Sequence, residues 1–154
     1  MKRSGILNQP LSNVLASFGH TDLLMVCDVG FPIPRDAQRV DLAIAPDLPD
    51  LRTILSLIDE EFITEKVVIA AEMAEFNPRL HEWLKESFSG AEFEPRPHEE
   101  MLKGVASQAK AIIRTGAFEP WGNIGLVSGV DVDRFFTKEG VMVPDYYRNQ
   151  VGGS

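Results

Sequence analysis

A five-residue apolar run, Leu23-Leu24-Met25-Val26-Cys27, is followed directly by Asp28 and by a loop that begins Val29-Gly30-Phe31-Pro32. A continuous apolar run of this length is typical of a strand that is buried on both faces. Strands of this kind occur in parallel sheets that are covered by helices on both sides. This run therefore favours an α/β domain.

Helix-like and strand-like segments alternate on both sides of this run. Apolar residues at three- and four-residue spacing predict helices over residues 11–18, 51–62 and 78–88, and a further helix that begins at Pro97. Short apolar runs predict strands over residues 40–45, 67–71, 109–113 and 124–130. The alternation predicts a three-layer α/β domain with a mostly parallel central sheet and helices on both faces. We expect this domain to span residues 1–130 and residues 131–154 to form a more polar C-terminal extension of unknown role.

The composition argues against several classes of function. The chain has 154 residues, with 15 basic and 23 acidic side chains and a net charge of −8. This balance repels phosphate backbones and anionic lipids, so neither nucleic acid nor a membrane is an expected partner. No apolar stretch approaches the ~20 residues that a membrane helix needs. The only cysteine, Cys27, excludes an internal disulfide and fits a reducing compartment, so we expect a soluble, cytoplasmic protein.

His20 is the first candidate for chemistry. It follows Gly19, which is a natural helix end, and precedes the buried strand. This places His20 on a connection at an edge of the sheet, where α/β proteins usually carry their sites. A surface histidine that interacts with a helix C-terminus would show the same pattern, so both interpretations stay open.

Asp28 and His98 are further candidates. Asp28 ends the apolar strand, from which its carboxylate can face a crevice and accept hydrogen bonds from two neighbouring hydroxyls. An Asx-turn within the loop is the structural alternative. His98 opens a predicted helix and belongs either to the edge of the core or to a cleft. The residues suggest one polar cleft built from His20, Asp28, His98 and Asn123.

The triplet Trp121-Gly122-Asn123 is the last candidate. An indole face beside an amide can hold a sugar by apolar stacking and hydroxyl hydrogen bonding, although Trp121 could equally fill the core. The sequence contains no nucleotide-binding glycine motif, zinc-protease motif or nucleophile elbow. A two-histidine, one-carboxylate metal site from His20, His98 and Asp28 is an alternative that the residues leave open.

An ordered set of segments resembles the D-ribose pyranase family. The segments are Lys2-Arg3-Ser4-Gly5-Ile6-Leu7-Asn8, Gly19-His20-Thr21-Asp22, Asp28-Val29-Gly30-Phe31-Pro32-Ile33-Pro34, Arg39-Val40-Asp41-Leu42-Ala43, His98-Glu99-Glu100, residues 109–116, and residues 123–130. The L-fucose mutarotases are related to this family. The Gly-Ile-Leu-Asn start, Gly-His-Thr-Asp and the Pro-Ile-Pro loop are more similar to the ribose branch.

The resemblance implies a cofactor-free and metal-free isomerase that interconverts the pyranose and furanose forms of D-ribose. By analogy, His20 is the catalytic acid, and Asp28, His98, Trp121, Gly122 and Asn123 bind the sugar. The family's triplet usually begins with tyrosine, which Trp121 replaces here. Family members form ring-shaped homo-oligomers, commonly decamers, with sites at subunit contacts.

Two alternatives accompany this expectation. The chain could be a mutarotase of L-fucose or another monosaccharide on the same scaffold, or a non-catalytic sugar-binding protein. A panel of aldoses in an exchange assay separates the first alternative from a ribose pyranase. Saturable sugar binding without faster exchange would indicate the second.

Overall fold

A computed structural model describes residues 1–152; residues 153 and 154, the end of the expected extension, lie outside the described residues. The strands of the domain form one six-stranded sheet in the order β2-β5-β1-β6-β3-β4. Their bounds are β1 Leu23–Cys27, β2 Arg39–Asp41, β3 Thr64–Ala70, β4 Glu92–Arg96, β5 Ala111–Arg114 and β6 Ile124–Ser128. β6 is antiparallel to both β1 and β3, whereas the other pairs are parallel. The prediction of a mostly parallel sheet is confirmed.

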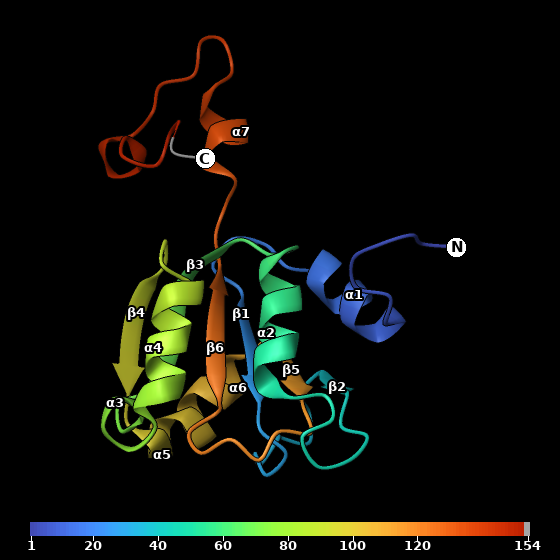
Figure 1. The fold of residues 1–154 in the computed structure, drawn as a ribbon. Coiled ribbons are helices and arrows are strands. Elements are labelled where there is room, and N and C mark those ends of the chain that lie inside the picture. Colours follow the sequence, from blue (N-terminus) through green and yellow to red (C-terminus); the bar gives the residue numbers. More distant parts are fainter. Residues whose placement is uncertain (153–154) are drawn as a thin grey trace.

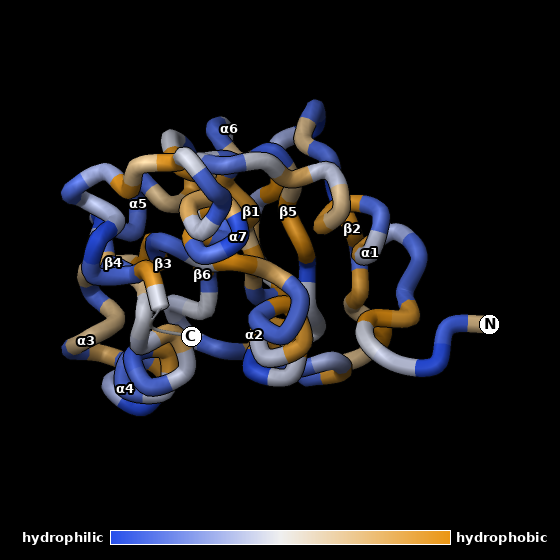
Figure 2. Tube along the Cα trace, turned by 90° about the horizontal axis from the view of Figure 1, so that it is seen from above, coloured by the Kyte–Doolittle hydropathy of each residue, from blue (hydrophilic) through white to orange (hydrophobic). Residues whose placement is uncertain are grey.

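Helices cover both faces of the sheet. The bounds are α1 Gln9–Ala16, α2 Leu51–Asp59, α3 Met73–Phe76, α4 Pro78–Ser87, α5 His98–Glu100, the π-helical η1 Met101–Val105, α6 Ala106–Gln108, α7 Val132–Phe136 and the 3-10 turn η2 Asp145–Tyr147. Seen from above, α2 and α4 lie on one side of the sheet and α5 and α6 on the other (Figure 2). The predicted three layers are therefore present.

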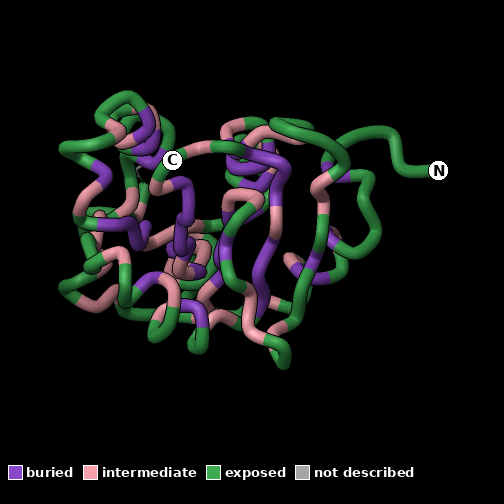
Figure 3. The backbone as a smooth tube through the Cα atoms, turned by 90° about the horizontal axis from the view of Figure 1, so that it is seen from below, coloured by how far each residue is buried: buried purple, intermediate pink, exposed green. Residues whose placement is uncertain are grey.

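Alternate residues of β1 point into the two halves of the core. Leu24 and Val26 pack with α1, α2 and α4, whereas Met25 and Cys27 pack with Met101 of η1 and Ala106 of α6. Because both faces of β1 are covered, all five of its residues are apolar. Figure 3 shows the buried segments concentrated between the layers and the exposed ones on the loops.

The starts of α1, α2 and α4 are fixed by side-chain caps. Asn8, Asp50 and Asn77 accept hydrogen bonds from backbone amides in the first turns of α1, α2 and α4. Such caps satisfy amides that have no partner within the helix. The caps set where each helix begins relative to the sheet edge.

The antiparallel direction of β6 decides where the chain leaves the domain. β6 ends at the edge where the other strands begin, and the extension projects beyond that edge (Figure 1). The edge that holds the carboxyl ends of β1–β5 lies at the opposite side of the sheet. We call these two edges the exit edge and the carboxyl edge.

Candidate active site

Most of the predicted site residues meet at the carboxyl edge. Asp28 follows β1, and His98 comes two residues after the end of β4. Asn123 precedes β6, and because β6 runs the other way its first residue lies at this same edge. The carboxyl ends of strands are where open α/β sheets place their ligand sites. The fold thus brings together segments that lie far apart in the sequence.

Asp28 and Asn123 hold each other in place. The amide of Asp28 donates to Oδ1 of Asn123, and Nδ2 of Asn123 donates to Oδ2 of Asp28, both at 3.1 Å. The amide of Gly30 donates to Oδ1 of Asp28 at 2.9 Å, which is the Asx-type bond given above as the structural alternative. Asn123 is only 3% exposed. The pair is therefore a rigid, preformed polar cluster rather than a mobile surface contact.

The carboxyl group of Asp28 has an unusual protonation equilibrium. Burial raises its pKa above the ordinary value, and hydrogen bonds from Gly30 and Asn123 and the nearby imidazole of His98 oppose this rise. A half-buried carboxylate has lost much of its water, so it gains from hydroxyl donors that replace the lost hydration. This environment suits a ligand that carries several hydroxyls.

The backbone amide of His98 is hydrogen-bonded, whereas one nitrogen of its ring has no partner among the described residues. Its amide donates to both carboxylate oxygens of Glu72, at 3.0 and 3.2 Å. Nδ1 of His98 is buried and has no hydrogen-bond partner among residues 1–152. Buried polar atoms without partners are rare in folded proteins. This nitrogen is therefore a candidate to contact a ligand hydroxyl beside Asp28.

Trp121 forms an aromatic pair with Phe76. The two rings stack with centroids 5.2 Å apart and an interplanar angle of 21°. Trp121 has a φ of 55°, a left-handed conformation that is costly for a residue with a side chain. Gly122 is required at the next position, because a Cβ atom there would lie 2.7 Å from the carbonyl oxygen of Glu119. Trp121 also packs against both halves of the core, so the core interpretation of this residue holds in part.

Three residues fix the turn that carries Trp121. None of them was predicted as a site residue. Glu119 accepts a hydrogen bond from Arg52 of α2 and another from Asn77, each at 2.7 Å. Asn77 also donates to the carbonyl of Pro120 at 2.9 Å. We call Arg52, Asn77 and Glu119 the turn clamp. Asn77 also caps α4, and no local sequence pattern marks Arg52 or Glu119.

His20 lies at the exit edge, apart from this cluster. Nε2 of His20 is 2.9 Å from Oε2 of Glu65, and both side chains are more than a third exposed. The whole of β1, about 16 Å at 3.3 Å per residue, separates His20 from Asp28. The expectation of one cleft that holds His20, Asp28, His98 and Asn123 is therefore not met within a single chain, because the strand puts its two ends on opposite edges.

The loop that carries His20 is tightly fixed. Thr21 has a φ of 71°, although a β-branched residue rarely adopts this conformation. Its amide donates to the carbonyl of Ser128 at 2.8 Å. Lys110 donates to Asp22 at 2.6 Å and thereby lowers the pKa of that carboxyl. Strained residues held in this way are frequent at functional sites.

The alternative metal site is not assembled in one chain. His20 lies at one edge of the sheet and Asp28 and His98 lie at the other, so these side chains do not converge. Within residues 1–152 no group of three His, Cys, Asp or Glu side chains is arranged to hold a metal ion.

No helix in the same described part is long and apolar enough to cross a bilayer.

Comparison with known proteins places the chain in a family. Residues 1–131 match the model of the RbsD/FucU transport protein family. This chain belongs to that family. It is 82% identical to a protein of Rubrobacter xylanophilus named D-ribose pyranase 2, over 99% of both chains. It is 61% identical to D-ribose pyranase 1 of Streptomyces griseus, over 98% of this chain and 100% of that protein.

A family member of known structure has the same fold. The structure of Bacillus subtilis RbsD complexed with D-ribose superimposes with a TM-score of 0.80 at 41% identity. The match covers 84% of this chain and 98% of the Bacillus chain. The Bacillus protein therefore corresponds to the domain without a comparable extension, whereas the Rubrobacter and Streptomyces relatives match over the full length.

Proposed function

We propose that this chain is a D-ribose pyranase, a cofactor-free cytoplasmic isomerase that interconverts the pyranose and furanose forms of the free sugar. The observation that carries the proposal is the preformed Asp28–Asn123 pair at the carboxyl edge. It lies in a chain that is 82% identical to one named D-ribose pyranase. A relative with a TM-score of 0.80 has been solved with D-ribose, and this supports ribose over other monosaccharides.

The reaction needs only proton transfers. Opening a cyclic hemiacetal breaks the bond between C1 and the ring oxygen, delivers a proton to that oxygen and removes the proton of the anomeric hydroxyl. Closing the ring through a different hydroxyl reverses these steps and gives the other ring form. The oxidation state of the sugar does not change. One positioned acid–base group, which gives a proton to the ring oxygen and in its deprotonated form takes up the proton of the anomeric hydroxyl, is therefore sufficient together with a set of hydroxyl-binding groups. Acid–base help of this kind is worth ~10²–10⁴-fold.

We assign these roles to the residues at the two edges. His20 donates the proton to the ring oxygen, and Glu65 orients its imidazole through the bond at Nε2. Asp28, His98 and Asn123 bind the sugar hydroxyls, and Trp121 and Gly122 form the wall beside the ring. Imidazole suits the proton transfer because its ordinary protonation change falls near neutral pH.

The separation of His20 from the sugar cluster implies that a complete site needs two copies of the chain. The exit edge of one copy supplies His20, and the carboxyl edge of its neighbour supplies Asp28, His98 and Asn123. An end-to-end contact of this kind uses two different surfaces, so it repeats and closes into a ring when the rotation allows. We therefore propose a homo-oligomer, of which the decamer expected from the resemblance is one closed form.

The test is ring exchange of D-ribose followed by NMR saturation transfer, with and without the protein. We expect the protein to accelerate exchange between the pyranose and furanose signals. A parallel panel that includes L-fucose measures whether another monosaccharide is exchanged faster, which would make the chain a mutarotase of that sugar. Saturable ribose binding without acceleration would instead show a non-catalytic binding protein and refute the proposed activity.

A further inference from the structure

Exposed apolar side chains gather at the two edges of the sheet. Within residues 1–152, most of the exposed large hydrophobic residues lie in the segments that follow β2, β3 and β5, in the turn before β3, or in the extension. At the carboxyl edge they are Ile44, Leu48, Phe76 and Phe118, and at the exit edge they are Ile63, Phe135, Val141, Met142 and Tyr146. Scattered exposed apolar residues are normal, whereas contiguous groups mark interaction sites. Both edges thus carry exposed apolar side chains.

At the carboxyl edge, three of these residues form one patch. The amide of Ile44 donates to the carbonyl of Leu48 at 2.9 Å, and the amide of Phe118 donates to Asp47 at 2.9 Å. These bonds join the loop after β2 to the segment after β5. We call Ile44, Leu48 and Phe118 the loop patch; each is more than half exposed. The patch lies at the same edge as the sugar cluster.

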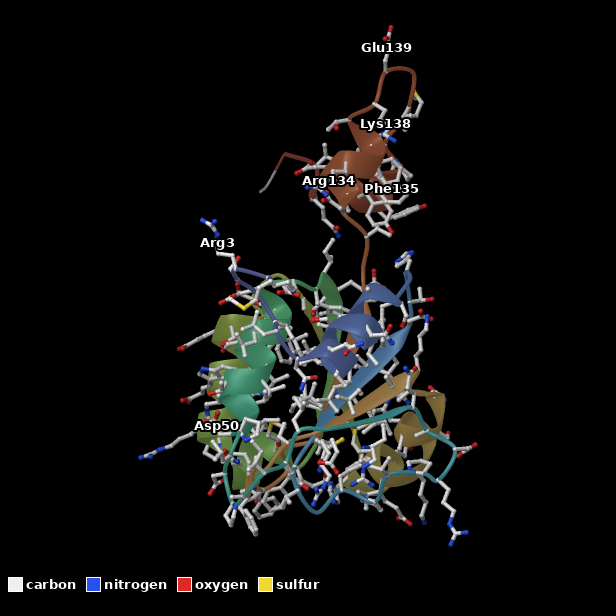
Figure 4. All side chains as sticks on the ribbon, turned by 90° about the vertical axis from the view of Figure 1, so that its right-hand side faces the viewer. Arg3, Asp50, Arg134, Phe135, Lys138 and Glu139 are labelled. Atoms are coloured by element: carbon white, nitrogen blue, oxygen red, sulfur yellow. The ribbon has the colours of Figure 1, made fainter. Side chains whose placement is uncertain are left out.

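The extension presents its own apolar side chains at the exit edge. It closes on itself through the ring contacts of Tyr147 with Phe136 and Tyr146, and through a 2.7 Å bond from the amide of Gly152 to Asp133. Phe135, Met142 and Tyr146 are between 60% and 86% exposed, and we call them the extension patch. Phe135, Lys138 and Glu139 stand clear of the domain (Figure 4).

Part of the extension borders the exit edge near His20. Val132 is buried, and with Tyr147 and Gln150 it lines a cavity of about 340 Å³ whose opposite wall includes Ile63 and Glu65. Glu65 is the residue that bonds His20. The extension patch is therefore carried on the same edge as the proposed proton donor.

We propose that the extension patch of one copy packs against the loop patch of a second copy and holds His20 of the first at the sugar cluster of the second. The proposal rests on the two-copy site proposed above. His20 and Asp28 can act on one sugar only if the exit edge of one copy meets the carboxyl edge of another. These two edges also carry the extension patch and the loop patch, so a second copy of the chain is the expected partner of each patch. Bacillus RbsD, which matches 84% of this chain, would make its contacts without this addition.

The test compares dissociation of the assembly by analytical ultracentrifugation over a range of protein concentrations. The variants are Phe135→Asp in the extension patch and Phe118→Asp in the loop patch. Each should raise the dissociation constant about 10- to 100-fold, the range expected when a large apolar side chain no longer leaves water. The double variant should fall short of the product of the two effects, because residues that contact each other are not additive.

Lys138→Gln is the matched control. It changes the charge of the same extension by the same single unit without removing apolar surface, so it should leave dissociation unchanged. Far-UV circular dichroism of every variant confirms that the domain is folded. A monomer at all concentrations, an unchanged dissociation constant in Phe135→Asp, or fully multiplicative effects in the double variant would each overturn the proposed contact.

Ribose exchange measured on the same samples separates this proposal from the proposed function. If the unmodified protein assembles and the variants weaken assembly, but no sample accelerates exchange, the contact stands and the pyranase activity fails. If exchange is accelerated and Phe135→Asp assembles normally, the activity stands and the contact fails.

Discussion

At the scale of single residues, the binding role proposed for Asp28 conflicts with its contribution to stability. Its pKa is raised, so the folded chain favours the protonated carboxyl more than the unfolded chain does. The stability that this group contributes is present at low pH and is lost as the pH rises through the raised pKa. At neutral pH the folded protein thus carries an unfavourable charge, as expected for a group that is kept for a ligand rather than for folding.

The raised pKa of Asp28 predicts an acid limit for ribose binding. The carboxylate must be charged to accept two hydroxyls, so affinity should fall as the pH drops through a pKa that lies above the ordinary 3.8. Calorimetric titration at a series of pH values should show this fall. Asp28→Asn should weaken binding about tenfold or more at neutral pH, since hydrogen bonds to charged groups are worth about 1.5–3 kcal/mol.

Asp36→Asn is the control for Asp28, because it removes the same charge from an exposed position. It should bind ribose normally. Normal affinity in Asp28→Asn, or an acid limit that persists unchanged in that variant, would remove Asp28 from the binding site.

His20 gives the second prediction at this scale. His20→Ala should reduce protein-catalysed ribose exchange by ~10²–10⁴-fold in the saturation-transfer assay, because the proton donor is lost. Ribose binding should be largely kept, since the hydroxyl-binding groups lie at the other edge. His81→Ala removes the imidazole of a histidine in α4 to which no role is assigned, and it should leave exchange unchanged. An exchange rate in His20→Ala equal to that of the unmodified protein would exclude His20 from the mechanism.

At the scale of elements, the turn clamp connects α2 and the start of α4 to the turn that carries Trp121. Glu119→Gln removes the charge that Arg52 meets at 2.7 Å. We expect KM for ribose to rise about 3- to 10-fold with a smaller change in kcat, because the turn positions binding groups rather than the proton donor. The free energy of unfolding should fall by about 1 kcal/mol, as both side chains are about a quarter to a third exposed.

Glu99→Gln is the comparison for Glu119→Gln. Glu99 pairs with Lys103 at 3.0 Å, but both side chains are more than three quarters exposed. An ion pair that is largely exposed to water contributes little to the free energy of unfolding. This variant should therefore change neither KM nor thermal stability measurably. If Glu119→Gln behaves in the same way, the turn does not depend on the clamp.

Gly116 tests how closely the loop after β2 is packed on the end of β5. A Cβ atom there would lie 2.5 Å from the carbonyl oxygen of Ala45 and 2.7 Å from that of Leu48. Gly116→Ala should therefore lower the free energy of unfolding by about 3 kcal/mol in a urea titration, because backbone atoms must move. Gly104→Ala in η1, where no heavy atom lies within 4 Å of the added carbon, should leave stability unchanged or raise it by up to ~1 kcal/mol. Equal effects of the two substitutions would contradict the packing described here.

The elements differ in how well the sequence predicts them. β1 is predicted at its observed bounds because both of its faces are buried and its residues are all apolar. β4 was missed, because it is an edge strand with charged residues and Pro95. The strand predicted over residues 40–45 ends at Asp41, where the chain turns into the loop with Pro46 and Pro49. The pattern of apolar residues indicates which segments are buried, and it therefore does not predict an exposed edge strand such as β4.

The candidate site was predicted in part for a related reason. Asp28 was found because it directly ends a strand, and its pairing with Asn123 follows once both are placed at the carboxyl edge. The position of Asn123 depends on the direction of β6, which an apolar pattern does not reveal. The clamp residues and the distance between His20 and Asp28 depend on contacts between remote segments, which local spacing does not encode.

At the scale of the whole molecule, neither edge of one copy carries all of the groups that we propose act on the sugar. Mixing two variants that each lack one of these groups, at a ribose concentration too low to saturate Asp28→Asn, tests this directly. Chains with His20→Ala and chains with Asp28→Asn, co-expressed in equal amounts, should regain about one quarter of the unmodified exchange activity, because an end-to-end assembly joins an intact His20 to an intact Asp28 at that share of contacts.

A site contained in one chain predicts a different result for the mixture, since every chain would still lack one essential group. No recovery in mixed assemblies, shown by mass spectrometry to contain both chains, would contradict the two-copy site. The His20→Ala chain mixed with an equal amount of His20→Ala/Asp28→Asn chain is the control and should remain inactive.

The direction of β6 has a practical consequence for handling the protein. Because the chain leaves the sheet at the exit edge, an affinity tag or fluorescent reporter fused after the extension would start from the surface where we expect a neighbour to dock. The amino terminus lies at the same end of the domain, to one side, where the amide of Ile6 donates to Glu61 just before β3 (Figure 4). A fusion partner placed after the extension should therefore yield preparations of reduced mass and activity.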